Sequence, residues 1–146
     1  MHHFPKTLSR EESDALADSL EAGFQANGFG VWAVEVPSVE PVIGFVGLNR
    51  PRFEAHFTPC VEIGWRIGAE YWNRGYATEA AQAAVMFGFE TLGLREIVAF
   101  TVPANMPSRR VMEKIGMMHG QADDFDHPSL PEEHPLRRHV LYRICR

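Results

Sequence analysis

The spacing of apolar residues near the start of the chain predicts a helix. Ser9 begins a capping box, and Leu and Phe residues then recur at every fourth position, which places them on one helical face. The pattern predicts a helix from about Arg10 to Asn27, and Gly28 is the residue type at which helices commonly end.

Two strand-like segments follow this helix. Gly30–Val36 and Val42–Asn49 are rich in Val, Ile and aromatic residues, and a short segment that contains two prolines separates them. We therefore expect an antiparallel hairpin with a short loop.

The middle of the chain changes from a strand pattern to a helical pattern and back. Cys60–Gly68 predicts a third strand, whose internal glycine indicates a bulge or a close backbone approach. From Ala77 onward small and apolar residues lie on one helical face, and Gly93 ends this helix. Arg95–Val102 predicts the next strand, so strand, helix and strand should form a right-handed parallel crossover.

The last third of the chain contains shorter elements and one long loop. Met106–Ile115 predicts a short helix, a brief strand is expected near Met117, and Arg138–Ile144 predicts the final strand. Between them Gln121–Arg137 is polar and rich in proline. A loop of this length in a compact domain is usually functional or mobile.

Composition and charge limit the classes of partner. The chain has 146 residues, 45% of them apolar, so we expect residues 1–146 to form a single domain. The formal net charge is -5 and there is no run of basic residues, which argues against nucleic acid and against an anionic membrane surface. The acidic balance favours a cationic partner such as an amine. The sequence shows no signal peptide and no membrane span.

Cysteine and tryptophan residues are expected to serve packing. Cys60 and Cys145 are too few for a disulfide framework, which fits a reducing cytoplasm, and we expect both to be buried small hydrophobes. Trp32, Trp65 and Trp72 are also expected to be packing residues. Trp72 lies near enough to the next loop to shape a pocket.

The segment YWNRGYATEA forms a helix entrance without a usual cap. No Ser, Thr or Asp precedes the helix, so its first N–H groups must bond to water or to a ligand, and an anion fits their partial positive charge. Gly75 would let the backbone approach a phosphate, while Arg74 adds charge and Thr78 adds a donor. Alternatively, Gly75 only makes the turn and Glu79 complements the helix dipole.

Three segments together resemble the GNAT acetyltransferase superfamily: VEIGWRIGAEYWNRGYATEAAQAAVMFGF, REIVAFTV and NMPSRRVMEKIGM. The likeness is strongest to the branch that acetylates the amino termini of ribosomal proteins. It implies an α/β (α+β) fold with a mixed, largely antiparallel central sheet, a splayed parallel strand pair and flanking helices. Relative to that branch, the chain is expected to be shortened at its N-terminus and to lack the family's first strand and helix.

The resemblance implies acetyl-CoA as co-substrate and assigns residues to it. The loop amides that would bind the pyrophosphate belong to Arg74, Gly75, Tyr76, Ala77 and Thr78. The pantetheine arm would pair with backbone near Trp65, Arg66 and Ile67, and Asn105 would contact the cofactor. Simpler readings are that Trp65 and Ile67 are core residues, that Arg66 is solvated, and that Asn105 caps the short helix.

Two residues are candidates for catalysis. The resemblance places Glu62 near the splay as the group that takes a proton from the amine, although a carboxylate there could also pair with a neighbouring Arg or His. It places Ser108 near the departing sulfur as a general acid or positioning residue, although a first-turn Ser can simply bond to its own helix.

The tail contains possible metal ligands in the stretch from Asp123 to His127, and at His134 and His139. Their spacing is not that of a metal site, and no metal is expected. The loop is either a solvated acidic segment or a wall of the acceptor pocket, where its acidic side chains would suit a cationic acceptor.

The sequence as a whole predicts an N-acetyltransferase that acts by direct transfer to a primary amine, either a peptide amino terminus or a small molecule. The alternatives are a non-catalytic acyl-CoA-binding module and a dimeric scaffold. Gly30–Val36 would form an exposed apolar sheet edge, which a homodimer could cover.

Overall fold

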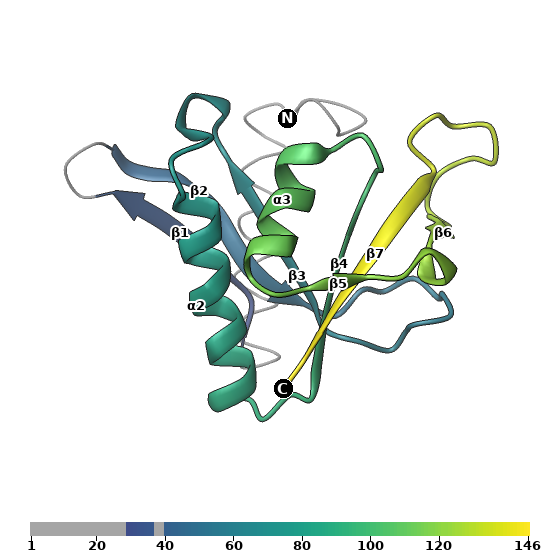
Figure 1. The fold of residues 1–146 in the computed structure, drawn as a ribbon, viewed down its shortest axis with the longest axis horizontal. Coiled ribbons are helices and arrows are strands. Elements are labelled where there is room, and N and C mark those ends of the chain that lie inside the picture. The colour runs from purple at the N-terminus through teal and green to yellow at the C-terminus, as the bar shows by residue number, and fades with distance from the viewer. Residues whose placement is uncertain (1–28, 37–39) are drawn as a thin grey trace.

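The computed structural model describes residues 29–36 and 40–146 (Figure 1). The predicted helix from Arg10 to Asn27 lies outside the described residues. Within the described ranges, no helix is long and apolar enough to cross a membrane.

The described chain forms a mixed sheet with the strand order β1-β2-β3-β4-β7-β5, and β6 pairs with β7 outside this path. Its elements are β1 (Val31–Val36), β2 (Glu40–Asn49), β3 (Glu62–Ile67), the 3-10 turn η1 (Ala69–Tyr71), α2 (Tyr76–Glu90), β4 (Glu96–Thr101), α3 (Met106–Lys114), β5 (Met118–His119), the 3-10 turn η2 (Gln121–Asp123), β6 (Phe125–Asp126) and β7 (Arg138–Cys145). Strands β1 and β2 form the predicted antiparallel hairpin.

The centre of the sheet opens between two parallel strands. β2 pairs with β3 from Gly44↔Ile67 to Asn49↔Glu62, and β4 pairs with β7 from Glu96↔Cys145 to Thr101↔Val140. In contrast, β3 and β4 share only the pair Glu62↔Val98, beside a bond from the Val98 N–H to the Val61 carbonyl. The two strands separate beyond this point, which confirms the predicted splayed parallel pair.

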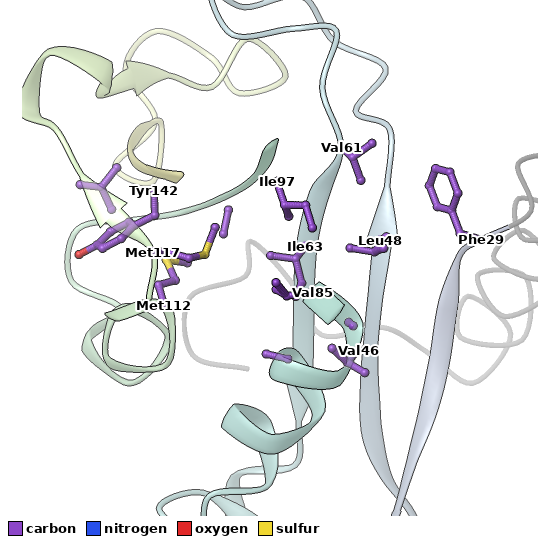
Figure 2. Packing of buried hydrophobic residues seen from close by; sticks show 14 residues of the cluster. Phe29, Val46, Leu48, Val61, Ile63, Val85, Ile97, Met112, Met117 and Tyr142 are labelled. Carbon is purple, nitrogen blue, oxygen red and sulfur yellow. The ribbon is translucent and has the colours of Figure 1, made fainter. Parts of the chain in front are cut away.

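Helices α2 and α3 lie on one face of the sheet (Figure 1). The larger core cluster lies beneath them, where Val85 of α2 packs near Ile63 of β3 and Ile97 of β4 (Figure 2). Gly88 allows α2 to approach the sheet, because a Cβ there would lie 2.8 Å from the Ile97 Cδ1 atom. A smaller cluster, built on Phe57, Val98, Phe125 and Leu141, includes the alternate residues of β4 and β7.

Two expectations about the tail and the cysteines need correction. β6 interrupts the predicted loop from Gln121 to Arg137 and pairs Phe125 with His139. Cys145 is exposed because it is the last residue of β7, beyond the buried run Val140–Tyr142, and Cys60 is only partly buried. Burial nevertheless raises the pKa of the Cys60 thiol to about 11, with smaller contributions from the carboxylates of Glu62 and Glu96, so this thiol stays protonated at neutral pH.

Candidate active site

Two cavities meet where β3 and β4 separate. The first has a volume of about 230 Å³ and lies against the N-terminus of α2, and the second has a volume of about 400 Å³ and lies beside Glu62. Trp65, Asn105 and Ser108 line both cavities. A ligand that extends from the first cavity to this junction would therefore lie next to a ligand bound in the second cavity.

The N-terminus of α2 opens into the first cavity without a side-chain cap. Gly75 occupies the N-cap position with φ 81° and ψ 0°, and no side chain accepts a hydrogen bond there. Tyr76, Ala77 and Thr78 line the cavity directly after it. A Cβ at Gly75 would have nothing within 4 Å, so glycine is required here by the left-handed backbone rather than by lack of space. Uncapped amides of this kind can bind an anion.

Basic side chains of α3 face the same cavity. Arg110 and Lys114 lie one helical turn apart and line it, as does Arg66 from β3, whose pKa is lowered by burial. Arg74 is exposed and is not among the lining residues. The sequence reasoning did not select Arg110 and Lys114, although their spacing of four on a helix that follows Asn105 was a usable signal.

The free edge of β3 forms another wall. The Gly68 N–H bonds to the Ile43 carbonyl of β2, and alternate residues of a strand direct their backbone groups to the same neighbour. The backbone groups of Trp65 and Ile67 therefore point toward the gap that β4 leaves. The Trp72 indole N–H donates to the Ile67 carbonyl over 2.7 Å, which holds the segment after β3 against the strand end. Trp72 also lines the cavity, as its position near the loop suggested.

Hydrogen bonds connect Trp65, Thr101, Asn105 and Ser108 at the junction. Asn105 caps α3, because its Oδ1 accepts from the Ser108 N–H at 3.4 Å, while its Nδ2 donates to the Thr101 hydroxyl at 3.0 Å. The Trp65 indole N–H donates to the Ser108 Oγ at 3.3 Å. Because that contact uses a lone pair of the hydroxyl, the Ser108 proton stays available for a ligand in either cavity.

Glu62 lines the second cavity at the last point where β3 and β4 are paired. Burial raises the pKa of Glu62 to about 7, and a hydrogen bond from the Asn49 side-chain amide, at 3.5 Å, opposes this rise. Among residues 29–36 and 40–146, Glu62 forms no ion pair, so its neighbour is a neutral amide rather than an Arg or His. A carboxyl group with a pKa near 7 can exchange protons readily at neutral pH.

The segment between β6 and β7 forms the far wall of the second cavity. His127, Ser129, Leu130 and Leu136 line it, and His139 joins them from β7. The acidic residues of the loop do not, which favours the first of the two alternatives for them, a solvated acidic segment. Instead, Asp123 bonds to Arg143, Asp124 to His119, and Asp126 to Arg137 and Arg138. In the described part of the chain, His, Cys, Asp and Glu form no cluster that could hold a metal ion.

Residues 1–118 match the profile of the acetyltransferase (GNAT) domain. This chain belongs to the GNAT acetyltransferase domain family. It is 27% identical to a GNAT-family acetyltransferase from Bacillus anthracis, with a TM-score of 0.78 over 99% of this chain and 80% of that structure. The splayed pair, the uncapped loop and the helix after Asn105 therefore lie in a domain of the expected family.

Two further proteins extend the comparison. The FsC-acetyl coenzyme A-N(2)-transacetylase of Aspergillus fumigatus is 42% identical over 95 residues, which cover 63% of this chain and 40% of that protein. A ribosomal-protein-S5-alanine acetyltransferase from Vibrio fischeri, at 17% identity, shares the fold with a TM-score of 0.75, over 98% of this chain and 78% of that structure. The chain spans between 33% and 59% of the length of the curated relatives it matches.

The first cavity contains features that fit acetyl-CoA. Uncapped amides and basic side chains suit phosphate groups, and a free strand edge suits an amide-containing arm. Of the eleven residues selected from sequence, nine line the first cavity or lie at its junction, and Glu62 lines the second. Arg74 is the exception.

Proposed function

We propose that this chain is an acetyl-CoA-dependent N-acetyltransferase that moves an acetyl group directly to a primary amine. The observation that carries the proposal is the junction of the two cavities at Trp65, Asn105 and Ser108. One cavity offers an anion site and a free strand edge, and the other offers a carboxyl group with a pKa of about 7. The family membership and the name of the A. fumigatus relative support the same cofactor.

The first cavity would hold the co-substrate. The amides of Gly75, Tyr76, Ala77 and Thr78 would bind its pyrophosphate, with Arg110 and Lys114 available for further phosphate charge. The backbone of Trp65 and Ile67 would pair with its pantetheine arm, and Asn105 would contact it at the start of α3. Arg74 stays a predicted contributor, and Arg66 could contribute only through its side chain, because its backbone groups face β2 by the alternation along β3. When bound, acetyl-CoA supplies the thioester whose acyl group is transferred.

Glu62 would prepare the amine. An ammonium has no lone pair with which to attack, so a base must remove a proton directly or through a water molecule. With a pKa of about 7, Glu62 is partly ionised at neutral pH and can accept that proton. The backbone N–H of Trp65, on the free edge of β3, would stabilise negative charge that develops on the acyl oxygen.

Ser108 would assist the leaving group. Its Oγ accepts from Trp65, so the hydroxyl proton is free to be donated to a departing sulfur at the junction. Neither Ser108 nor Glu62 is proposed to form a covalent bond with the acyl group, because the proposed transfer is direct.

Two single substitutions test these roles. We expect Glu62→Gln to lower kcat/KM by about 100-fold and Ser108→Ala by about tenfold, the range in which single general acids and bases act. Glu90→Gln is the matched control, because Glu90 is exposed at the far end of α2. CoA affinity, measured by calorimetry, should be unchanged in both active-site variants. Wild-type rates in both would refute the assignment of these residues.

The alternatives give different results in the same assays. A non-catalytic acyl-CoA-binding module would bind CoA but acetylate no amine, and a dimeric scaffold would not bind CoA. A homodimer through β1, the last strand of the described sheet, stays a prediction that is based on the apolar edge of this strand. A cytoplasmic location also stays a prediction, based on the small number of cysteines. Light scattering of the purified chain tests the dimer.

A further inference from the structure

The second cavity has mainly apolar walls. Its volume of about 400 Å³ lies in the size range of small-ligand pockets. Leu130 and Leu136 line it, as do Phe100 of β4 and Val102, the residue directly after β4. The part of a ligand that lies against these apolar residues would lose its contact with water.

Among the described residues that line this cavity, Glu62 is the only carboxylate. The other titratable groups are His127 and His139, and burial lowers the pKa of both, with His139 adding a smaller effect on His127. Both rings are therefore uncharged at neutral pH. In the neighbouring loop, Asp123, Asp124 and Asp126 are bonded to Arg143, His119, Arg137 and Arg138, and Glu132 and Glu133 are exposed and do not line the cavity.

Three rings form an aromatic part of the wall. The centroids of His127 and His139 are 5.0 Å apart, and each lies 6.0 Å from the centroid of Phe100. All three residues line the cavity, so this cluster can pack against a planar group through edge or offset contacts.

We propose that the acceptor is a primary amine with a single positive charge and an apolar, preferably aromatic, body. The inference rests on the proposed acetyltransferase activity. Glu62 can attract one ammonium group and take its proton, while the body lies along Phe100 and the two leucines. A second ammonium group in the same cavity would lose its hydration without meeting a counter-charge. Polyamines are therefore poor acceptors.

A matched pair of acceptors tests this selectivity on the wild-type chain. Hexylamine and 1,6-diaminohexane have the same six-carbon chain, and the diamine carries a second ammonium group at its far end. With acetyl-CoA as donor, we expect kcat/KM for hexylamine to exceed that for the diamine by at least about tenfold, because the second charge is desolvated. We expect 2-phenylethylamine to be acetylated at least as well as hexylamine. A diamine that equals or exceeds hexylamine would overturn the inference.

A substitution pair tests the charge of the wall. Leu136→Asp adds a carboxylate, and Leu136→Asn adds a neutral side chain of the same shape. We expect the aspartate variant to move the preference toward 1,6-diaminohexane by about tenfold relative to the asparagine variant. Leu130→Asp and Leu130→Asn repeat the comparison if the first pair does not fold, with CoA binding as the measure of folding. An unchanged preference in a folded pair would overturn the inference.

The results separate this inference from the proposed function. If the wild type binds CoA but acetylates none of the three amines, this inference fails; the acetyltransferase proposal fails with it only if peptide amino termini are not acetylated either. If it acetylates the diamine as well as hexylamine, the enzyme assignment stands and only the acceptor class is wrong.

Discussion

At the scale of single residues, Glu62 has an unusual position for an acidic side chain. It lines a cavity, its pKa is raised to about 7 mainly by burial, and its neighbouring polar side chain is the amide of Asn49. The raised pKa means that the folded chain binds a proton that the unfolded chain has already lost. The same burial that makes Glu62 a usable base therefore reduces stability as its charge appears.

The activity should depend on pH with a definite sign. Glu62 acts as a base only when ionised, so we expect kcat/KM to rise with pH and to level off above a pKa of about 7. In Glu62→Gln this rise should disappear from the residual rate. A pH profile of initial rates measures the effect, and an identical acid limb in the variant would show that another group controls it.

The stability of the same variant should change in the opposite sense to its activity. Because the folded pKa of Glu62 is raised above the usual 4.5, the wild type loses stability as pH increases from about 4.5 to about 7. Glu62→Gln removes this loss. We therefore expect the variant to be more stable than the wild type. This advantage in the free energy of unfolding should be about 1 to 2 kcal/mol larger at pH 8 than at pH 5.5, a figure reduced because Glu62 is partly exposed. Urea titrations at the two pH values measure the difference, and a pH-independent difference would contradict the prediction.

At the scale of elements, α2 and α3 bring different kinds of group to one cavity. α2 contributes its uncapped N-terminus, whereas α3 contributes side chains one turn apart, Arg110 and Lys114. The first feature could be predicted from the absence of a capping residue before Gly75. The second could not be placed from sequence alone, because it depends on which side of α3 turns toward the gap between β3 and β4.

Two glycines at opposite ends of α2 allow a controlled test. Gly75 and Gly93 both have left-handed backbones, with φ of 81° and 68°, and a Cβ at either would have nothing within 4 Å. Alanine at either position should cost about 1 kcal/mol of stability from backbone strain alone. Only Gly75→Ala should also weaken CoA binding, by about tenfold, because the loop amides shift. Calorimetry and thermal unfolding measure the two effects, and equal CoA affinity in both variants would refute the loop's role.

The basic residues near the cavity can be ranked. Arg110→Gln and Lys114→Gln should each weaken CoA binding by about three- to tenfold, because each removes a charge from the cavity wall. Arg74→Gln should have a smaller effect, since Arg74 is exposed and does not line the cavity. Increasing the salt concentration should reduce these differences. If Arg74→Gln has the largest effect, the loop binds the phosphates with side chains rather than with amides.

At the scale of the whole molecule, local sequence patterns predicted the order of the helices and strands around the site better than they predicted the side chains that line it. The order β3, α2, β4, α3 followed from changes of hydrophobic period and from glycines that end helices, and the resemblance added the splayed pair. The lining of the second cavity depends on β6, which has only two residues and pairs through Phe125 and His139. A strand that short has no readable period, so the sequence leaves open whether the acidic loop residues line the pocket, and in the structure histidine and leucine line it instead.

Arg143 connects this wall to the sheet. Its Nε and Nη2 atoms donate to the two Asp123 carboxylate oxygens at 3.0 and 3.3 Å, and its Nη1 donates to Glu96 of β4 at 2.9 Å. These bonds raise the pKa of Arg143 further, with Asp123 the largest cause. A paired contact of this geometry restricts both side chains more than a single ion pair does. The turn η2 is therefore fixed to β7 just before the segment that lines the second cavity.

Asp123→Asn should loosen the acceptor wall without altering the cofactor cavity. We expect a loss of about 1 kcal/mol of stability and an increase of several-fold in the KM for the amine, because the loop would then be less well ordered around its ligand. CoA affinity should not change, since Asp123 does not line the first cavity. Asp126→Asn is the matched control, because its ion pairs with Arg137 and Arg138 are longer, at 3.8 and 3.5 Å, and more exposed. If the two variants have the same amine KM, the Asp123–Arg143 pair does not position the wall, and the order of the acceptor site must come from the packing of Phe125 and its aromatic neighbours.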